Sequence, residues 1–266
     1  MAIQKQQKYK YIIYEKWGRI AYITINRPEV LNATHTPALV EINSIVSDFI
    51  DDDDVWVAIL TGTGERAFSA GADLKYFSEK EHQEDLRRPE LHVKHVLDDC
   101  PKPVIAAVNG YAVGGGLELA LRCDIIVAAE HARFGLPEPR RGLMADTGGV
   151  LKLPKRIPFH VAMGLILTGK LITAQEAFRI GLINEVVPMS DLLETARGWA
   201  QEILECSPLA VQAAKEVVLK SMDSSNGMDP ISMEKINSLQ RLRSSEDYKE
   251  GPMAFAEKRK PVWKGK

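Results

Sequence analysis

The chain has 266 residues, of which 45% are hydrophobic and 26% charged, values that fit one large folded domain, or a core with an appendage, and exclude a disordered chain. Its 34 lysines and arginines are balanced by 36 aspartates and glutamates, which disfavours a dedicated nucleic-acid-binding protein. No apolar run approaches the roughly 18 residues that span a bilayer. We therefore expect neither a nucleic-acid nor a membrane partner.

Cysteines and histidines give little sign of a metal site. Cys100, Cys123 and Cys206 are scattered and lack the spacing of a disulfide framework or a zinc knuckle. His92 and His95 stand three residues apart with no accompanying carboxylate motif, so a solvated helix face is favoured over a metal site. No apolar run follows the first lysines, so no secretory leader is expected. These features together favour a reducing, cytoplasmic location.

The N-terminal part of the chain predicts two strands followed by a helix. Residues 11–14 and 19–25 have the β-branched and aromatic content of strands. Thr36 followed by Pro37 predicts a helix start with Thr36 as its N-cap. The acidic run 51–54 indicates a solvated turn after that helix, because like charges repel one another.

Three apolar runs then predict buried strands, at residues 55–60, 104–108 and 125–128. They are continuous, not alternating, which indicates strands covered on both faces. A helix is expected at 116–121, between the second and third runs. This order of strand, turn, helix and strand is typical of right-handed crossovers.

A weak internal repeat links the first two of these strands. Residues 55–74 and 104–120 both run from a buried strand through a small-residue loop toward a helix start, an offset of about 49 residues that suggests a spiral of similar turns. From about Gly148 the pattern becomes helical. Helices are expected near 161–167, 173–179, 192–205, 208–219 and 251–258.

Two loops of small residues, 68–73 and 113–118, allow a ligand to approach the main chain closely. A helix that begins near Gly115 offers unpaired N–H groups and the positive end of its dipole. Donors from the two loops could converge on one oxygen as it becomes negative, which is an oxyanion hole. The alternative is that the glycines only let a helix pack close to the sheet. Residues 62–67 match a dinucleotide-binding G-x-G-x-x-A pattern, but a second loop follows where a long helix is required, so a turn is predicted.

Three acidic residues are candidates for chemistry. Glu118 falls in a first helical turn, where acids are common because they interact favourably with the helix dipole. Glu138 stands between Pro137 and Pro139, which hold its backbone stiffly outside a helix interior. Asp146 precedes two glycines and is most simply a helix N-cap.

Taken together, the loops resemble the enoyl-CoA hydratase/isomerase (crotonase) superfamily. The resemblance implies an α/β fold built as a spiral of ββα turns, with a spiral core over 1–200 and a helical trimerisation region over 201–266. It further implies a homotrimer or homohexamer, an acyl-CoA thioester substrate, and no metal or redox cofactor beyond the coenzyme A of the substrate. The matching stretches span nearly the whole chain in the family's order: residues 25–28, 31–33, 68–75, 102–110, 114–120, 123–124, 134–138 and 250–259.

Position by position, the resemblance implies that the N–H groups of Ala70 and Gly115 bind the thioester oxygen. Glu118 and Glu138 stand where hydratases keep two catalytic glutamates. Water addition across C2=C3 needs an activated water at C3 and a proton at C2, with a stabilised enolate between. We therefore expect Glu118 to activate the water and Glu138 to exchange the C2 proton.

Further substrate contacts follow from the same resemblance. Two residues of the tail, Phe255 and Lys258, match those that in relatives reach the CoA of a neighbouring subunit.

Asp146 replaces a glycine of simple hydratases, a departure that leaves dienoyl-CoA isomerisation and carnitinyl-CoA dehydration open as alternatives to hydration. RNA binding is a third alternative, which the charge balance disfavours. The remaining expected contacts are Arg27, Ala72, Asp73, Leu74 and Gly114.

Overall fold

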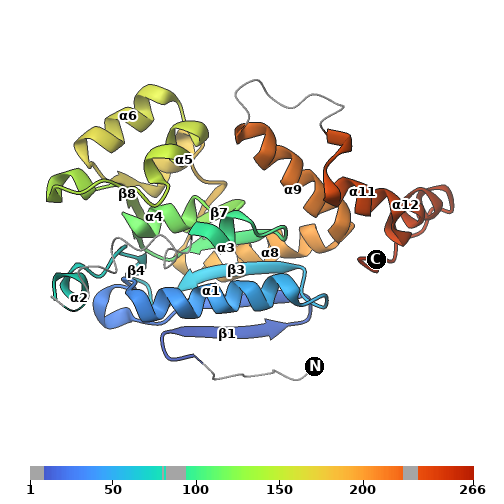
Figure 1. Cartoon of the computed structure of the whole chain (residues 1–266), viewed down its shortest axis with the longest axis horizontal. Coiled ribbons are helices and arrows are strands. Elements are labelled where there is room, and N and C mark those ends of the chain that lie inside the picture. The colour runs from blue at the N-terminus through green and yellow to red at the C-terminus, as the bar shows by residue number, and fades with distance from the viewer. Residues whose placement is uncertain (1–8, 80, 82–93, 224–232) are drawn as a thin grey trace.

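The computed structural model describes residues 9–79, 81, 94–223 and 233–266 of the chain. Two sheets form its centre (Figure 1). The larger has the order β1 (Ile12–Trp17), β2 (Ile20–Ile25), β3 (Val57–Gly62), β5 (Val104–Val108), β7 (Ile125–Ala129) and β10 (Glu185–Val187). The smaller has the order β4 (Ala67–Ser69), β6 (Tyr111–Val113), β8 (Arg133–Gly135) and β9 (Ile172–Thr173).

The chain winds between the sheets as a spiral. The pairs β3 and β4, β5 and β6, and β7 and β8 each place one strand in the larger sheet and the next in the smaller. Within each sheet these strands run parallel. The predicted repeat is therefore real, and the structure adds a third copy at residues 125–135 that the sequence comparison missed. Because parallel strands end at a common edge, the loops after β4, β6 and β8 meet in space.

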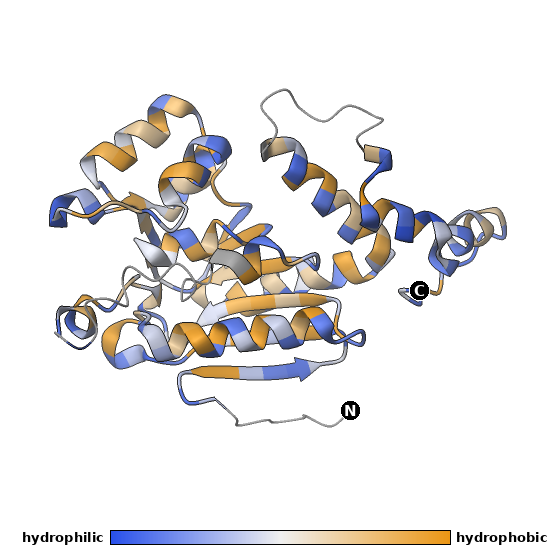
Figure 2. Cartoon of the chain, viewed as in Figure 1, coloured by the Kyte–Doolittle hydropathy of each residue, from blue (hydrophilic) through white to orange (hydrophobic). Residues whose placement is uncertain are grey.

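Strand β3 shows why continuous apolar runs become central strands. Ala58 and Leu60 face the cluster that holds the buried side of α1 (Thr36–Asp51). Val57 and Ile59 face the opposite cluster, with Leu192 of α8 (Leu192–Leu204). Successive side chains of a strand point to opposite faces, so both faces need apolar residues, and β3 is orange along most of its length in Figure 2. The prediction of strands covered on both faces is confirmed.

The predicted N-terminal elements are confirmed with one shift. β1 and β2 pair as an antiparallel hairpin. α1 has Thr36 as its first helical residue, so His35 and not Thr36 is the N-cap. The helix ends at Asp51, where the acidic run begins. Residues 63–66 form a bend between β3 and β4, which confirms the turn in place of a dinucleotide-binding helix.

The second half of the chain is mostly helical, as predicted, but not wholly so. β9 and β10 were not expected there, because they are only two and three residues long and pair with β8 and β7 at the sheet edges. The division of the chain at residue 200 stays a prediction. The helices of this half are α5 (Gly149–Arg156), α6 (Phe159–Thr168), α7 (Ala174–Arg179), α8, α9 (Pro208–Asp223), α11 (Asn237–Ser244) and α12 (Glu246–Ala256).

Shorter helices connect the strands. They are α2 (Leu74–Ser78), α3 (Lys94–Asp98) and α4 (Gly115–Ala120), with 3-10 turns η1 (Pro28–Val30), η5 (Glu138–Arg141) and η6 (Met189–Asp191). The predicted helix at 116–121 is confirmed as α4. Within the described ranges, no helix is both long and apolar enough to cross a membrane.

Candidate active site

A cavity of about 620 Å³ lies at the edge where β4, β6 and β8 end. The loop after β4 contributes Ala70 and Ala72, the loop after β6 contributes Gly114 and Gly115, and the loop after β8 contributes Glu138. The size and a partly apolar wall are typical of small-molecule sites. The apolar wall is built by Leu31, Leu39, Leu74, Phe77, Leu143 and Leu171.

Glu118 lies on this cavity in the first turn of α4, with only 3% of its surface exposed. Its carboxylate is held by the loop that leads into α5. The Gly149 N–H donates to Oε1 at 2.7 Å, and the Thr147 hydroxyl donates to Oε2. Two donors on the two oxygens fix the orientation of the carboxylate.

Glu138 lines the same cavity, but its carboxyl group has different surroundings from that of Glu118. It begins η5 between two prolines, as the sequence predicted, and its Oε2 is buried without a hydrogen-bonding partner among the described residues. Burial raises the pKa of Glu138 to about 7, and the negative charges of Glu118 and Asp146 act in the same direction. The site therefore holds two carboxyl groups in contrasting settings, one held by donors and one able to keep a proton near neutral pH.

The structure corrects the expected pair of main-chain donors. The Ala70 N–H donates to the Leu31 carbonyl at 3.0 Å, so it is not free to bind a ligand. Ala72 lies opposite Thr34 in a parallel β-bridge. The two hydrogen bonds of the bridge are made by the neighbours of Ala72: the Thr34 N–H donates to the Gly71 carbonyl, and the Asp73 N–H donates to the Thr34 carbonyl. In such a bridge the Ala72 N–H points away from Thr34.

On its other side, Ala72 meets the start of α4. A Cβ added at Gly115 would lie 3.6 Å from the Ala72 nitrogen, and one added at Gly71 would lie 2.9 Å from the Gly115 nitrogen. Among the described residues, neither the Ala72 nor the Gly115 amide donates a hydrogen bond that the structure records. The two amides that lie together at the cavity are therefore those of Ala72 and Gly115.

Gly114 explains the small-residue loop in steric terms. Its φ of 57° is in the left-handed region, and a Cβ there would lie 2.8 Å from Glu138 Oε1. A side chain at this position would collide with the acid, so the glycine does more than let α4 pack on the sheet.

Two expected substrate contacts bind each other instead of lining the cavity. The Arg27 guanidinium donates to Asp73 Oδ2 at 2.9 Å and to the Ala33 carbonyl. Asp73 also caps α2 by accepting the Tyr76 N–H. The pair braces the loop that carries Ala72, and the expected substrate contacts of Arg27 and Asp73 stay a prediction.

Leu74 and Asp146 do line the cavity, as expected for substrate contacts. Asp146 is exposed and is not the N-cap of α5, because that helix begins after Gly148, whose φ of 127° suits only glycine. Its interpretation as a simple cap is wrong, and its carboxylate faces the same space as the two glutamates.

Phe255 and Lys258 lie at the end of α12, far along the chain from the cavity residues. Phe255 is 88% exposed, and Lys258 is exposed with a positive φ. Neither lines the cavity of its own chain. Their expected contact with a neighbouring subunit stays a prediction.

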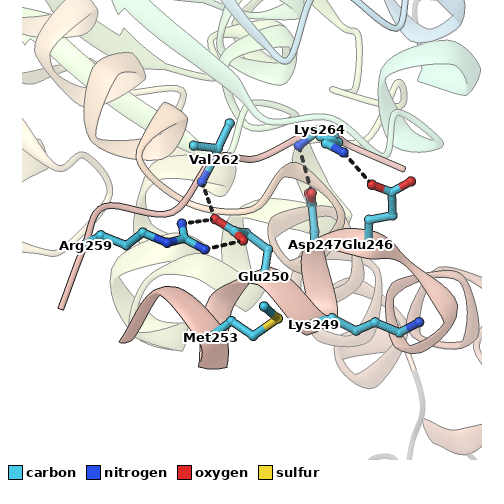
Figure 3. A pocket seen from close by; sticks show the side chains of 8 residues that line it. All are labelled: Glu246, Asp247, Lys249, Glu250, Met253, Arg259, Val262 and Lys264. Atoms are coloured by element: carbon cyan, nitrogen blue, oxygen red, sulfur yellow. Dashed lines mark hydrogen bonds and ion pairs between the residues drawn. The ribbon is translucent and has the colours of Figure 1, made fainter. Parts of the chain in front are cut away.

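A second hollow, of about 410 Å³, lies between α12 and the tail that follows it (Figure 3). Glu250 accepts two hydrogen bonds from the Arg259 guanidinium, which together with the Val262 N–H lowers the pKa of Glu250 to about 2. Buried Asp247 accepts the Lys264 N–H at 2.8 Å. These carboxylates are occupied in fixing the tail, so this hollow is not the candidate site.

No group of three or more His, Cys, Asp and Glu residues placed to hold a metal ion occurs in the described part of the chain. His92 lies outside the described residues, and the side chain of His95 is not described.

Comparisons with known proteins agree with this geometry. The sequence model for enoyl-CoA hydratase/isomerase matches residues 15–266. The chain belongs to the enoyl-CoA hydratase/isomerase family. A carnitinyl-CoA dehydratase from Salmonella typhi is 44% identical over 252 residues, which cover 94% of this chain and 96% of that protein.

Solved structures of the enoyl-CoA hydratase/isomerase family share the fold. An enoyl-CoA hydratase from Mycobacterium tuberculosis has a TM-score of 0.82 at 39% identity, covering 96% of this chain and 99% of that one. An enoyl-CoA hydratase from Bacillus anthracis has a TM-score of 0.89 at 35% identity, covering 97% and 100%. The crotonase-like spiral is thus confirmed. These relatives are named as a dehydratase and hydratases, and the chain is an enzyme of this hydro-lyase type.

The sequence analysis missed the partners of Glu118. Thr147 and Gly149 follow it by 29 and 31 residues and bind its carboxylate only once β8 and η5 have returned the chain to α4. Arg122, four residues after Glu118, donates to the Glu118 carbonyl at 2.8 Å. The local signal was this four-residue spacing, which places the Arg122 guanidinium against the Glu118 carbonyl just past the end of α4.

Proposed function

We propose that this enzyme catalyses the reversible syn addition of water to a 2-enoyl-CoA thioester. The observation that carries the proposal is the pairing of two carboxyl groups, Glu118 and Glu138, on one cavity beside two free main-chain amides. The two carboxyl groups can then carry out the two proton transfers of hydration, and the two amides can stabilise the negative charge of the enolate formed between them. Family membership supports the thioester as substrate class.

The settings of the two acids suggest their roles. Glu118 accepts hydrogen bonds on both oxygens, which suits a carboxylate that takes a proton from water attacking C3. Glu138 has a raised pKa of about 7, which suits an acid that delivers a proton to C2. Working on one face of the substrate, the pair would give syn addition.

The amides of Ala72 and Gly115 would receive the thioester oxygen as it becomes an enolate oxygen. Donors that are fixed before reaction are worth more than water molecules, because they need no reorganisation as charge develops. The start of α4 adds the positive end of its dipole.

A second candidate, dehydration of a carnitinyl-CoA-like thioester, is favoured by one observation. The carnitinyl-CoA dehydratase relatives are 44% identical over nearly their full length. The chemistry at C2 and C3 would be the same, and only the acyl group would differ. Isomerisation of a double bond by the same two acids is the other outcome that the test must separate.

The deciding experiment incubates the enzyme with a panel of enoyl-, dienoyl- and crotonobetainyl-CoA thioesters and analyses the products by mass spectrometry. Hydration adds the mass of one water, whereas isomerisation leaves the mass unchanged and moves the double bond. Water addition to crotonyl-CoA supports the main proposal. Turnover of crotonobetainyl-CoA alone supports the second candidate, and no water addition to any thioester contradicts both.

The pKa of Glu138 predicts a pH dependence for hydration. The protonated acid is needed, so kcat/KM should be flat below about pH 7 and fall about tenfold per unit above it. Hydration takes up and releases no proton overall, so its equilibrium constant does not change with pH and kcat/KM for the reverse dehydration should follow the same profile. Initial rates in both directions across this range measure the two profiles. Asp146→Asn removes a negative charge that raises the pKa of Glu138, so in this variant the fall in kcat/KM should begin at a lower pH. A hydration profile that is flat across neutral pH contradicts the role of Glu138.

We also propose that the enzyme is a homotrimer or homohexamer in which Phe255 and Lys258 reach the CoA of a neighbouring subunit. Lys258→Ala should then raise KM for the acyl-CoA with kcat little changed, because a phosphate contact is lost in ground state and transition state alike. Lys260→Ala, an exposed lysine two residues further, is the matched control. An unaltered KM for Lys258→Ala would refute the contact.

A further inference from the structure

Arg122 lies directly behind Glu118, just past the end of α4. It is buried, with only 3% of its side chain exposed. One terminal nitrogen donates to the Glu118 carbonyl at 2.8 Å, and the other donates to the Thr147 carbonyl. Its guanidinium thus joins the helix that carries Glu118 to the loop that binds the Glu118 carboxylate.

That loop is held at several points. The Thr147 carbonyl accepts from Arg122 while its hydroxyl donates to Glu118. A Cβ added at Gly148 would lie 3.2 Å from a terminal nitrogen of Arg122, so the loop backbone packs directly on the guanidinium. The next residue, Gly149, supplies the second donor to the carboxylate.

The charge of Arg122 is also balanced within the fold. Asp98, at the end of α3, has one carboxylate oxygen 3.5 Å from Arg122 Nε and the other 2.8 Å from Lys152 Nζ, two ion pairs. Lys152 belongs to α5, the helix that this same loop begins. The ion pairs therefore link the guanidinium, through Asp98, to the helix that follows the segment it braces.

We infer that Arg122 is a positioning residue for catalysis: it holds the 147–149 loop so that Thr147 and Gly149 keep the Glu118 carboxylate in one orientation. Arg122 is among the residues that line the cavity, but its two terminal nitrogens donate to the Glu118 and Thr147 carbonyls and its Nε lies 3.5 Å from Asp98 Oδ2, so it acts through Glu118. This role rests on the proposed function of Glu118 in water activation.

Arg122→Met keeps much of the side chain's length and removes every donor. Its kcat for crotonyl-CoA hydration should fall by about 10²-fold with KM little changed, because a small misplacement of a reacting group is enough for such a loss. Arg133→Met is the matched control, since Arg133 also donates to two backbone carbonyls, those of His131 and Ala132, but lies outside the cavity lining. The control should keep its kcat even where its Tm falls.

Hydrogen exchange of the peptide spanning 145–151 measures the loop without any turnover, and it should be faster in Arg122→Met and unchanged in Arg133→Met. If the wild-type enzyme hydrates no thioester, the proposed function fails while the exchange result still decides whether Arg122 holds the loop. Should Arg122→Met not fold, Asp98→Asn and Thr147→Val replace it, with Thr147→Ser as the variant that keeps the hydroxyl. Wild-type kcat in both replacements, or unchanged exchange and kcat in Arg122→Met, would overturn the inference.

Discussion

Glu138→Gln should lower kcat for hydration by about 10²–10⁴-fold, the usual contribution of one general acid or base. Glutamine keeps the shape and hydrogen-bonding capacity of the side chain but has no proton to exchange with C2. The variant should fold normally, because Glu138 Oε2 has no partner in the described structure that the amide would lose. Replacing a buried acid of raised pKa by a neutral amide removes no ion pair. Steady-state kinetics with crotonyl-CoA and a thermal melt measure the two effects separately.

The control for this variant is Glu130→Gln. Glu130 is exposed on the connection between β7 and β8 and lies outside the cavity lining, so its kcat should match that of the wild type. Turnover of Glu138→Gln close to the wild-type rate would remove Glu138 from the mechanism. A large fall in kcat for both variants would show that the loss does not report on the site.

The two acids could be found from the sequence because local features mark them. Glu138 stands between two prolines, and Glu118 follows the glycines that begin a helix. What separates their chemistry was not visible locally. The donors to Glu118 come from residues 29 and 31 positions away, and the pKa of Glu138 depends on burial that only the folded chain provides.

The larger architecture was predictable for a similar reason. Buried strands such as β3 carry apolar side chains on both faces, and the resulting continuous apolar run can be recognised in the sequence alone. The third turn of the spiral was missed because the loop after β8 carries Pro137, Glu138 and Pro139 in place of the small residues that follow β4 and β6 in the first two turns. Short edge strands such as β10 depend on a neighbour for their existence and leave little local signal.

The choice between Ala70 and Ala72 shows where sequence reasoning stops. Both alanines lie in one small-residue loop, and composition does not tell which N–H faces the cavity. The direction is set by contacts with residues more than thirty positions upstream: Leu31 accepts the Ala70 N–H, and Thr34 pairs on either side of Ala72.

Replacing Ala72 by lactic acid, which turns its amide into an ester, should lower kcat by about 10²–10³-fold, the usual cost of losing one oxyanion donor. The methyl side chain is kept, so only the N–H is removed. The same replacement at Ala70 is an exact chemical match. It removes the hydrogen bond to Leu31, so it should lower stability by about 1 kcal/mol while kcat is retained.

The ester at position 72 also makes the Gly71 carbonyl a weaker acceptor for the Thr34 N–H, so some loss of stability is expected there as well. Denaturant unfolding of both esters measures that effect, and kinetics below the unfolding transition isolate the catalytic one. If the loss of kcat appeared at Ala70 and not at Ala72, the donor pair would be Ala70 and Gly115 after all, and the substrate would have to break the Ala70–Leu31 hydrogen bond on binding. If neither ester changed kcat, the enolate would not be stabilised by this loop, and the hydration mechanism would lose its central electrostatic element.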